Sequence, residues 1–241
     1  MNKLPQLTLL FWIMKICATT LGETAGDLFS MTLGVGYATS SLILFLIFIG
    51  ILIWQLISKS YIPAVYWLVI LATSTVGTTI SDFMDRTMKL GYPTGSLILV
   101  LLLCVILFLW KAKEKSVSVD KISTRSSEIF YWVSILCSNT LGTALGDFLA
   151  DSSGLGFFGG ALLITVLLTL ILLAYYFTKI SHVLLFWLAF VLTRPFGATF
   201  GDLLTKPHIN GGLGFGTIGS SMVLFAILII TIIYSSNTKN A

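Results

Sequence analysis

Four decapeptides of one pattern decide the fold of this 241-residue chain: ATTLGETAGD at residues 18–27, TSTVGTTISD at 73–82, SNTLGTALGD at 138–147 and TRPFGATFGD at 193–202. Each decapeptide ends in an aspartate that follows a tryptophan by 15 residues. Successive copies are 55, 65 and 55 residues apart, and the tryptophans are Trp12, Trp67, Trp132 and Trp187. Because self-similarity at a regular period is typical of repeat architectures, the sequence predicts four copies of one structural unit.

The composition of the chain is that of a membrane protein. Hydrophobic residues make up 56% of it and charged residues 10%, and the mean hydropathy is +0.99. A soluble domain carries about 25% charged residues, and roughly 20 apolar helical residues span a bilayer core. Each copy holds two apolar segments, so all copies run in the same direction. We therefore predict an all-α polytopic membrane protein with eight transmembrane helices from four parallel two-helix repeats, at 7–28, 40–57, 63–84, 95–110, 129–150, 160–177, 183–204 and 217–234.

The repeats are expected to form one integral membrane domain. A polar stretch at 111–128 carries eight of the chain's charges and separates the second copy from the third. We interpret it as a cytoplasmic linker, because so few polar residues cannot bury a core. The repeats then cover 1–58, 59–110, 129–179 and 180–241.

The placement of basic residues predicts the orientation, because cytoplasmic loops of membrane proteins are rich in Lys and Arg. Nine basic residues lie on the side of the termini and the loops between repeats: Lys3, Lys59, Lys111, Lys113, Lys115, Lys121, Arg125, Lys179 and Lys239. The turns within repeats carry three: Arg86, Lys89 and Lys206. We expect both termini in the cytoplasm of a bacterial cell, the chain in the inner membrane, and the four tryptophans at the cytoplasmic interface.

Polar residues recur every four positions in each decapeptide. A helix places residues i, i+4 and i+8 on one face, so each copy presents a polar stripe. The stripes are Thr19, Glu23, Asp27; Ser74, Thr78, Asp82; Asn139, Thr143, Asp147; and Arg194, Ala198, Asp202. Ionisable groups are costly in lipid. We therefore predict that the four striped helices form an inner ring and that the other four, almost uncharged, form a lipid-facing outer layer.

Small residues four apart accompany the stripes and let transmembrane helices approach closely. By themselves they indicate packing only, which is compatible with a central site. The glycines expected to pack are Gly22, Gly26, Gly77, Gly142, Gly146, Gly197 and Gly201.

The intramembrane carboxylates are the candidate functional groups. An aspartate before a glycine-rich turn can simply end a helix, but its recurrence in four copies favours a site. Glu23 has no acidic counterpart in the other copies and is the first candidate. With all groups ionised, five carboxylates against Lys15 and Arg194 give a net charge of about −3, which suits a proton or a hard cation such as Mg²⁺, Ca²⁺ or Mn²⁺. The predicted metal ligands are Glu23, Asp27, Asp82, Asp147 and Asp202, with Thr19, Thr78, Asn139, Thr143 and Arg194 beside them.

Three functions remain open: secondary transport or export of a divalent cation, transport of an organic or anionic solute recognised by Arg194 and Lys15, and a scaffold without transport. Lys15 is expected to reach the cytoplasmic headgroups or to pair with Glu23. Arg194 is expected to pair with Glu23 or a neighbouring aspartate, and Pro195 to kink its helix. No enzymatic activity is expected, because no catalytic constellation appears. The expected partners are the lipid bilayer and a small ion or solute, with no nucleic acid and no cofactor.

At these residues the chain resembles a family of bacterial multi-spanning membrane proteins built from four tandem copies of a two-helix repeat of unknown function. The resemblance covers nearly the whole chain and implies a topology but no activity. A weaker likeness connects Glu23-Thr24-Ala25-Gly26-Asp27 with the manganese and cation transporters marked by Glu-x-Gly-Asp. That likeness implies cation transport through carboxylates.

Overall fold

The computed structural model describes residues 4–119, 122 and 124–238. Lys3, Asp120, Lys121 and Lys239, which belong to the charge counts above, lie outside the described residues. Within the described part the regular structure is helical, with eight long helices and no strand. The helices are α1 (Leu9–Asp27), α2 (Tyr37–Ile57), α3 (Pro63–Asp82), α4 (Tyr92–Glu114), α5 (Arg125–Asp147), α6 (Gly156–Phe177), α7 (His182–Thr205) and α8 (Thr217–Thr238). Each lies within a few residues of its predicted range.

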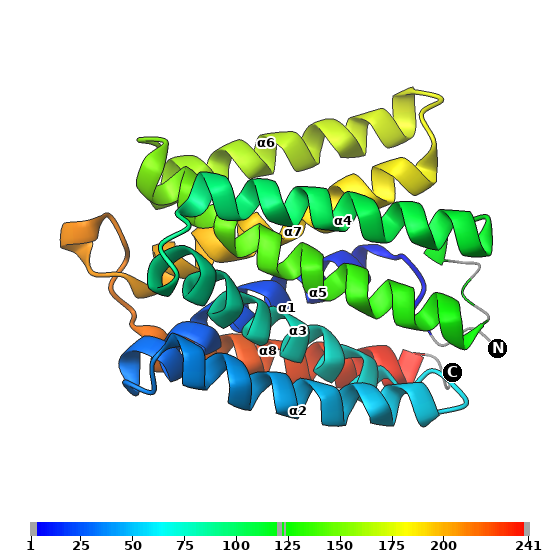
Figure 1. Cartoon of the computed structure of the whole chain (residues 1–241), viewed down its shortest axis with the longest axis horizontal. Helices are drawn as coiled ribbons and strands as arrows, with labels where there is room; N and C mark the ends of the chain where they lie inside the picture. The colour runs from blue at the N-terminus through cyan, green and yellow to red at the C-terminus, as the bar shows by residue number, and fades with distance from the viewer. Residues whose placement is uncertain (1–3, 120–121, 123, 239–241) are drawn as a thin grey trace.

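The eight helices form two layers (Figure 1). Helices α1, α3, α5 and α7 make a closed inner ring in that order, each packed against the next and α7 against α1. In the view of Figure 1 this ring lies between α4 and α6 above and α2 and α8 below. The predicted inner ring and outer layer are confirmed, because the striped helices α3 and α5 bury most of their residues, whereas α6 and α8 bury few.

Each outer helix packs mainly on the inner helix of the next copy. Helix α2 lies along α3, α4 along α5 and α6 along α7, and α8 closes the circle on α1. The copies therefore interlock, because the outer helix of each copy packs on the inner helix of the next copy and not mainly on its own. This arrangement ties the first and last copies together.

One end of the bundle holds the turns that connect the two helices of each copy, and it is here called the turn end. The inner helices terminate there in a distinctive way. In the first three copies a five-residue π-helical turn follows the aspartate, at η1 (Leu28–Thr32), η2 (Phe83–Thr87) and η4 (Phe148–Ser152). In the fourth copy α7 continues to Thr205, and a 3₁₀ turn, η5 (His208–Asn210), follows. Gly36 and Gly91 then start α2 and α4 with φ of 81° and 74°, a conformation that glycine adopts without steric cost.

Seven of the eight helices of the described chain are long and apolar enough to cross a membrane. Helix α1 is not among them, because Lys15 and Glu23 lower its hydropathy. Both side chains are buried by the surrounding helices. The ring thus supplies α1 with the polar surroundings that its sequence requires.

The opposite end of the bundle, where α1 begins and α8 ends (Figure 1), is here called the terminal end. The place of the repeated tryptophans at the cytoplasmic interface stays a prediction: they lie at this end of the bundle, and Trp67, Trp132 and Trp187 are buried among other aromatic rings. Each follows a second aromatic residue, so four doublets fill this end of the ring: Phe11-Trp12, Tyr66-Trp67, Tyr131-Trp132 and Phe186-Trp187. The striped face points inward, and these rings lie on the same face.

Described residues of the stretch between α4 and α5 cover the aromatic doublets. Val119 and Ile122 are buried in the same hydrophobic cluster, and Val117 packs against it. The indole Nε1 of Trp187 donates a 3.0 Å hydrogen bond to the carbonyl oxygen of Val117. The terminal end of the ring is therefore covered by apolar residues of a stretch that is otherwise polar.

Candidate functional site

Arg194 lies at the centre of the ring with no exposed surface. Its Nη1 is 2.9 Å from Glu23 Oε2, which confirms the predicted ion pair. The guanidinium donates further hydrogen bonds to two hydroxyls and two carbonyls on the other inner helices: Thr78 Oγ1, Thr143 Oγ1 (2.8 Å), Ser74 O (3.1 Å) and Thr19 O (3.4 Å). The two hydroxyls in turn donate to Glu23 Oε2, at 3.2 and 3.3 Å. One arginine therefore connects all four inner helices, and Pro195 lies inside α7 beside it.

A cluster of three buried carboxylates adjoins this centre. Glu23, Asp147 and Asp202 come from α1, α5 and α7, and each has an oxygen within 4.8 Å of an oxygen of the other two. Each carboxylate also pairs with a different basic residue: Glu23 Oε2 with Arg194, Asp147 Oδ2 with Arg86 and Asp202 Oδ1 with Lys206. Every member of this carboxylate cluster thus keeps one oxygen outside its ion pair.

Two basic side chains connect the aspartates around the ring. Arg86 contacts Asp82 at 2.8 Å and Asp147 at 3.2 Å. Lys206 contacts Asp202 at 3.1 Å and Asp27 at 2.7 Å. Each cation therefore holds the aspartate four residues before it and one from a neighbouring inner helix.

Lys206 lies just beyond α7. Burial alone would lower the pKa of its ammonium group, but the carboxylates of Asp202 and Asp27 outweigh burial and raise the pKa above its ordinary value. Lys206 is therefore positively charged at neutral pH.

The charge balance of the core differs from the prediction of −3. Arg86 and Lys206, assigned from the sequence to the turns, join Lys15 and Arg194 among the five carboxylates. The formal net charge, with every group counted as ionised, becomes −1. It is −2 if Lys15, which lies deeper, is left out. Sequence reasoning missed these two residues, although both stand four positions after an aspartate, where a helix places them on the same face.

Lys15 occupies a separate level toward the terminal end. Its side chain is fully buried, donates to Asn139 Oδ1 at 3.4 Å and lies 4.0 Å from the centre of the Phe190 ring. Asn139 donates in turn to the hydroxyl of Thr73 at 2.9 Å. Both predictions for Lys15 are wrong, because the closed ring holds it inside, away from the surface, and Asn139 takes the place of Glu23.

The remaining predicted residues contribute in different ways. Thr78 and Thr143 are hydrogen-bonded to Glu23 and Arg194. Asp27 and Asp82 are not part of the carboxylate cluster and pair with Lys206 and Arg86. The hydroxyl of Thr19 donates to backbone carbonyls, including that of Thr193 at 3.2 Å. The aspartates at the ends of α1, α3 and α5 cap no backbone amide of the π turn that follows. Their buried ion pairs show that they do more than end a helix.

The predicted packing glycines all face the next helix of the ring. Gly22 and Gly26 lie against Ser74 and Thr78 of α3, and Gly77 against Asn139 of α5. The other two contacts follow the same direction around the ring. Gly142 and Gly146 of α5 lie against α7, and Gly197 and Gly201 of α7 lie against α1. Close approach of the four backbones brings the polar stripes within hydrogen-bonding reach.

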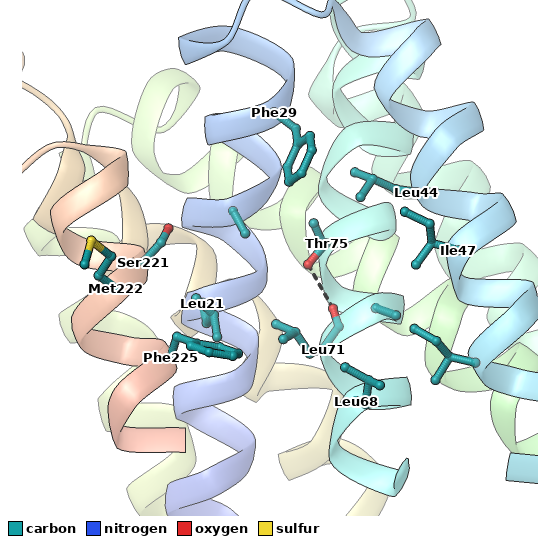
Figure 2. Close-up of a pocket in the computed structure, with 13 residues that line it drawn as sticks. Leu21, Phe29, Leu44, Ile47, Leu68, Leu71, Thr75, Ser221, Met222 and Phe225 are labelled. Carbon is teal, nitrogen blue, oxygen red and sulfur yellow. Dashed lines mark hydrogen bonds between the residues drawn. The ribbon is translucent and has the colours of Figure 1, made fainter. Parts of the chain in front are cut away.

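An apolar cavity of about 430 Å³ lies outside the ring, between α1, α2, α3 and α8. Figure 2 shows it lined by side chains such as Phe29, Leu44, Leu68 and Phe225. The hydroxyl of Thr75 donates to the carbonyl oxygen of Leu71 and is satisfied within its own helix (Figure 2). This cavity offers no charged ligand and is separate from the carboxylate cluster.

The fold and the site define a class of protein: a four-copy helical bundle with a polar inner ring, buried carboxylates and an apolar outer layer. Residues 10–61, 65–116, 130–181 and 185–240 each match the family described as Repeat of Unknown Function (DUF347), and the chain belongs to that family. No curated protein and no solved structure matches the chain. The resemblance to the Glu-x-Gly-Asp cation transporters is not shown by these comparisons.

Proposed function

We propose that this protein spans a bacterial inner membrane through eight helices, with both termini in the cytoplasm, and transports a hard divalent cation such as Mn²⁺ through its inner ring. The observation that carries the proposal is the carboxylate cluster, in which Glu23, Asp147 and Asp202 of three helices bring oxygen atoms within 4.8 Å of one another. Buried ionisable residues in a membrane mark ion paths. The nine-to-three distribution of basic residues supports the orientation.

The ligand chemistry supports a hard cation. Carboxylate and hydroxyl oxygens are the ligands of Mg²⁺, Ca²⁺ and Mn²⁺, whereas thiolates and imidazoles favour Zn²⁺ or Cu⁺. Cys17 and Cys137 point to outer helices, where their thiols donate to the carbonyls of Leu224 and Leu99. The cluster therefore presents oxygen alone.

The alternative of an anionic or organic solute is less well supported. It requires the guanidinium of Arg194 and the ammonium of Lys15 to face the solute. Arg194 already donates to five oxygen atoms of the protein, and Lys15 to Asn139. A solute would have to displace these buried hydrogen bonds.

The test compares two aspartates of α5 and its π turn. Asp147→Asn removes a charge from the cluster, whereas Asp151→Asn removes an exposed carboxylate four residues further on, which accepts a 3.1 Å hydrogen bond from Tyr92. We expect Asp147→Asn to weaken Mn²⁺ binding by about tenfold or more, because charge count sets the affinity of oxygen sites. Asp151→Asn should leave it unchanged.

Binding is measured by titrating the purified full chain with Mn²⁺ in detergent, and flux by a Mn²⁺-sensitive dye inside proteoliposomes. Equal loss in both variants, or no Mn²⁺ binding and no flux by the unaltered chain, would contradict cation transport. Absence of Mn²⁺ binding and flux in the unaltered chain, together with co-purifying proteins, would support a membrane scaffold without transport.

A further inference from the structure

The four contacts between neighbouring inner helices are of two kinds at the turn end. The linker divides the chain into two halves, copies one and two and copies three and four. Arg86 of copy two reaches Asp147 of copy three, and Lys206 of copy four reaches Asp27 of copy one. Both cross-helix ion pairs therefore join one half to the other. Among the described residues no ion pair joins the two inner helices of one half at this end, although glycines pack at all four contacts.

Arg86 and Lys206 occupy the same position of the repeat, four residues after its aspartate. The same position holds Met31 in copy one and Asp151 in copy three. Basic residues thus alternate around the ring, and the fold accommodates a neutral side chain of similar length at this position. A basic residue therefore recurs at this position in every second copy.

The two cations lie between the carboxylate cluster and the surface. Their side chains are 33% and 23% exposed, whereas their four aspartate partners are at most 6% exposed. Each touches one member of the cluster, Asp147 or Asp202, and one further aspartate. A metal ion that approaches from the turn end would meet the side chains of Arg86 and Lys206 before it meets the buried carboxylate oxygens.

The terminal end of the ring is closed more thoroughly. The hydroxyls of Tyr66 and Tyr131 form a 2.7 Å hydrogen bond between α3 and α5, and both residues are fully buried. Trp12 packs on Phe186 between α1 and α7. The same two contacts between halves are thus closed by aromatic residues at one end and by ion pairs at the other.

We propose that Arg86 and Lys206 form the gate of the cation path at the turn end: each occupies the carboxylates in place of the transported cation and moves away when that cation enters. This inference rests on the proposed function. Its physical basis is competition, because a resident positive charge and an incoming divalent cation are attracted to the same carboxylates and repel each other at short range. Arg86 and Lys206 are positioning residues, since they touch the ligands and not the cargo.

The experiment replaces each gate residue with the residue that copy one already uses. Arg86→Met and Lys206→Met remove one positive charge each, and Lys206→Arg keeps it. Lys89→Met is the matched control, because Lys89 is an exposed basic residue three positions after Arg86 in the connection between α3 and α4. Mn²⁺ affinity is measured in detergent and the rate of Mn²⁺ uptake in proteoliposomes, with the full chain throughout.

The gate predicts a gain of affinity. Each Met variant should bind Mn²⁺ about fivefold tighter or more, because the carboxylates lose a competing charge, and the double variant should bind tighter than either single variant. Lys206→Arg should restore the original affinity, and Lys89→Met should not differ from the unaltered chain. A purely structural role predicts weaker binding, because a loosened ring no longer holds its ligands together.

Unchanged or weaker Mn²⁺ binding in both Met variants would overturn the gate while leaving cation transport intact, provided that the unaltered chain binds and transports Mn²⁺. Absence of binding by the unaltered chain would instead refute the proposed function on which the gate rests. Should the Met variants fail to fold, Met31→Lys adds a third basic residue at the equivalent position. It should weaken Mn²⁺ binding about fivefold or more, and no change would overturn the gate.

Discussion

The inner and outer layers of this bundle consist of helices of similar length with opposite requirements. The inner helix α5 places Gly142 against the side chain of Arg194, whose guanidinium donates a hydrogen bond to Thr143 of α5. The outer helix α2 is uncharged and apolar through its middle, and Gly50 there has open space around it. The inner helix of the repeat is therefore constrained mainly by close contacts between backbones and polar groups, and the outer helix mainly by its hydrophobicity.

The largest effect is expected at the centre of the inner layer. Arg194→Met leaves Glu23 buried without its ion pair, and breaking one partner of a buried pair costs about 3–5 kcal/mol of unfolding free energy. The measurement is unfolding of the purified protein in detergent, followed by circular dichroism. The Glu23→Gln/Arg194→Met double variant removes both charges and should recover part of the loss. A double variant less stable than Arg194→Met would contradict the isolated-charge explanation.

An intermediate effect is expected where two inner helices touch. In Gly142→Ala the new methyl group overlaps the side chain of Arg194, and it lies against Pro195. Neighbours in a packed interior must shift to admit it, which costs about 1–3 kcal/mol. The same unfolding assay measures the loss. A stability equal to that of the unaltered protein would show that the inner helices are less tightly packed than the ring indicates.

The smallest effect is expected in the outer layer. Gly50→Ala makes the same chemical change in α2, where no atom lies within 4 Å of the added carbon. Alanine favours helix by up to about 1 kcal/mol over glycine, so stability should stay the same or rise slightly. A loss as large as that of Gly142→Ala would show that the two layers do not differ in packing.

Most of the fold could be predicted from the repeat, and only part of the candidate site. The spacing of the four aspartates and the charge pattern were enough to predict the inner ring. Arg194 was expected to pair with Glu23 or a neighbouring aspartate, and its partner is Glu23. The burial of Trp67, Trp132 and Trp187 was not predicted, because a tryptophan packed inside a bundle has the same local sequence as one that faces lipid. Lys15 was misplaced because its partner, Asn139, is 124 residues away.

Local periodicity and composition are enough to make the chain helical, fourfold repeated and polar on one face of every second helix. Which inner helices are neighbours, which inner helix each outer helix packs on, and which basic side chain pairs with which carboxylate depend on the folded arrangement. Those outcomes depend on closing the ring between α7 and α1. Closure of the ring is a long-range packing event in which glycines bring the backbones together. It places the four polar stripes in one buried site, where the carboxylates pair with different basic side chains.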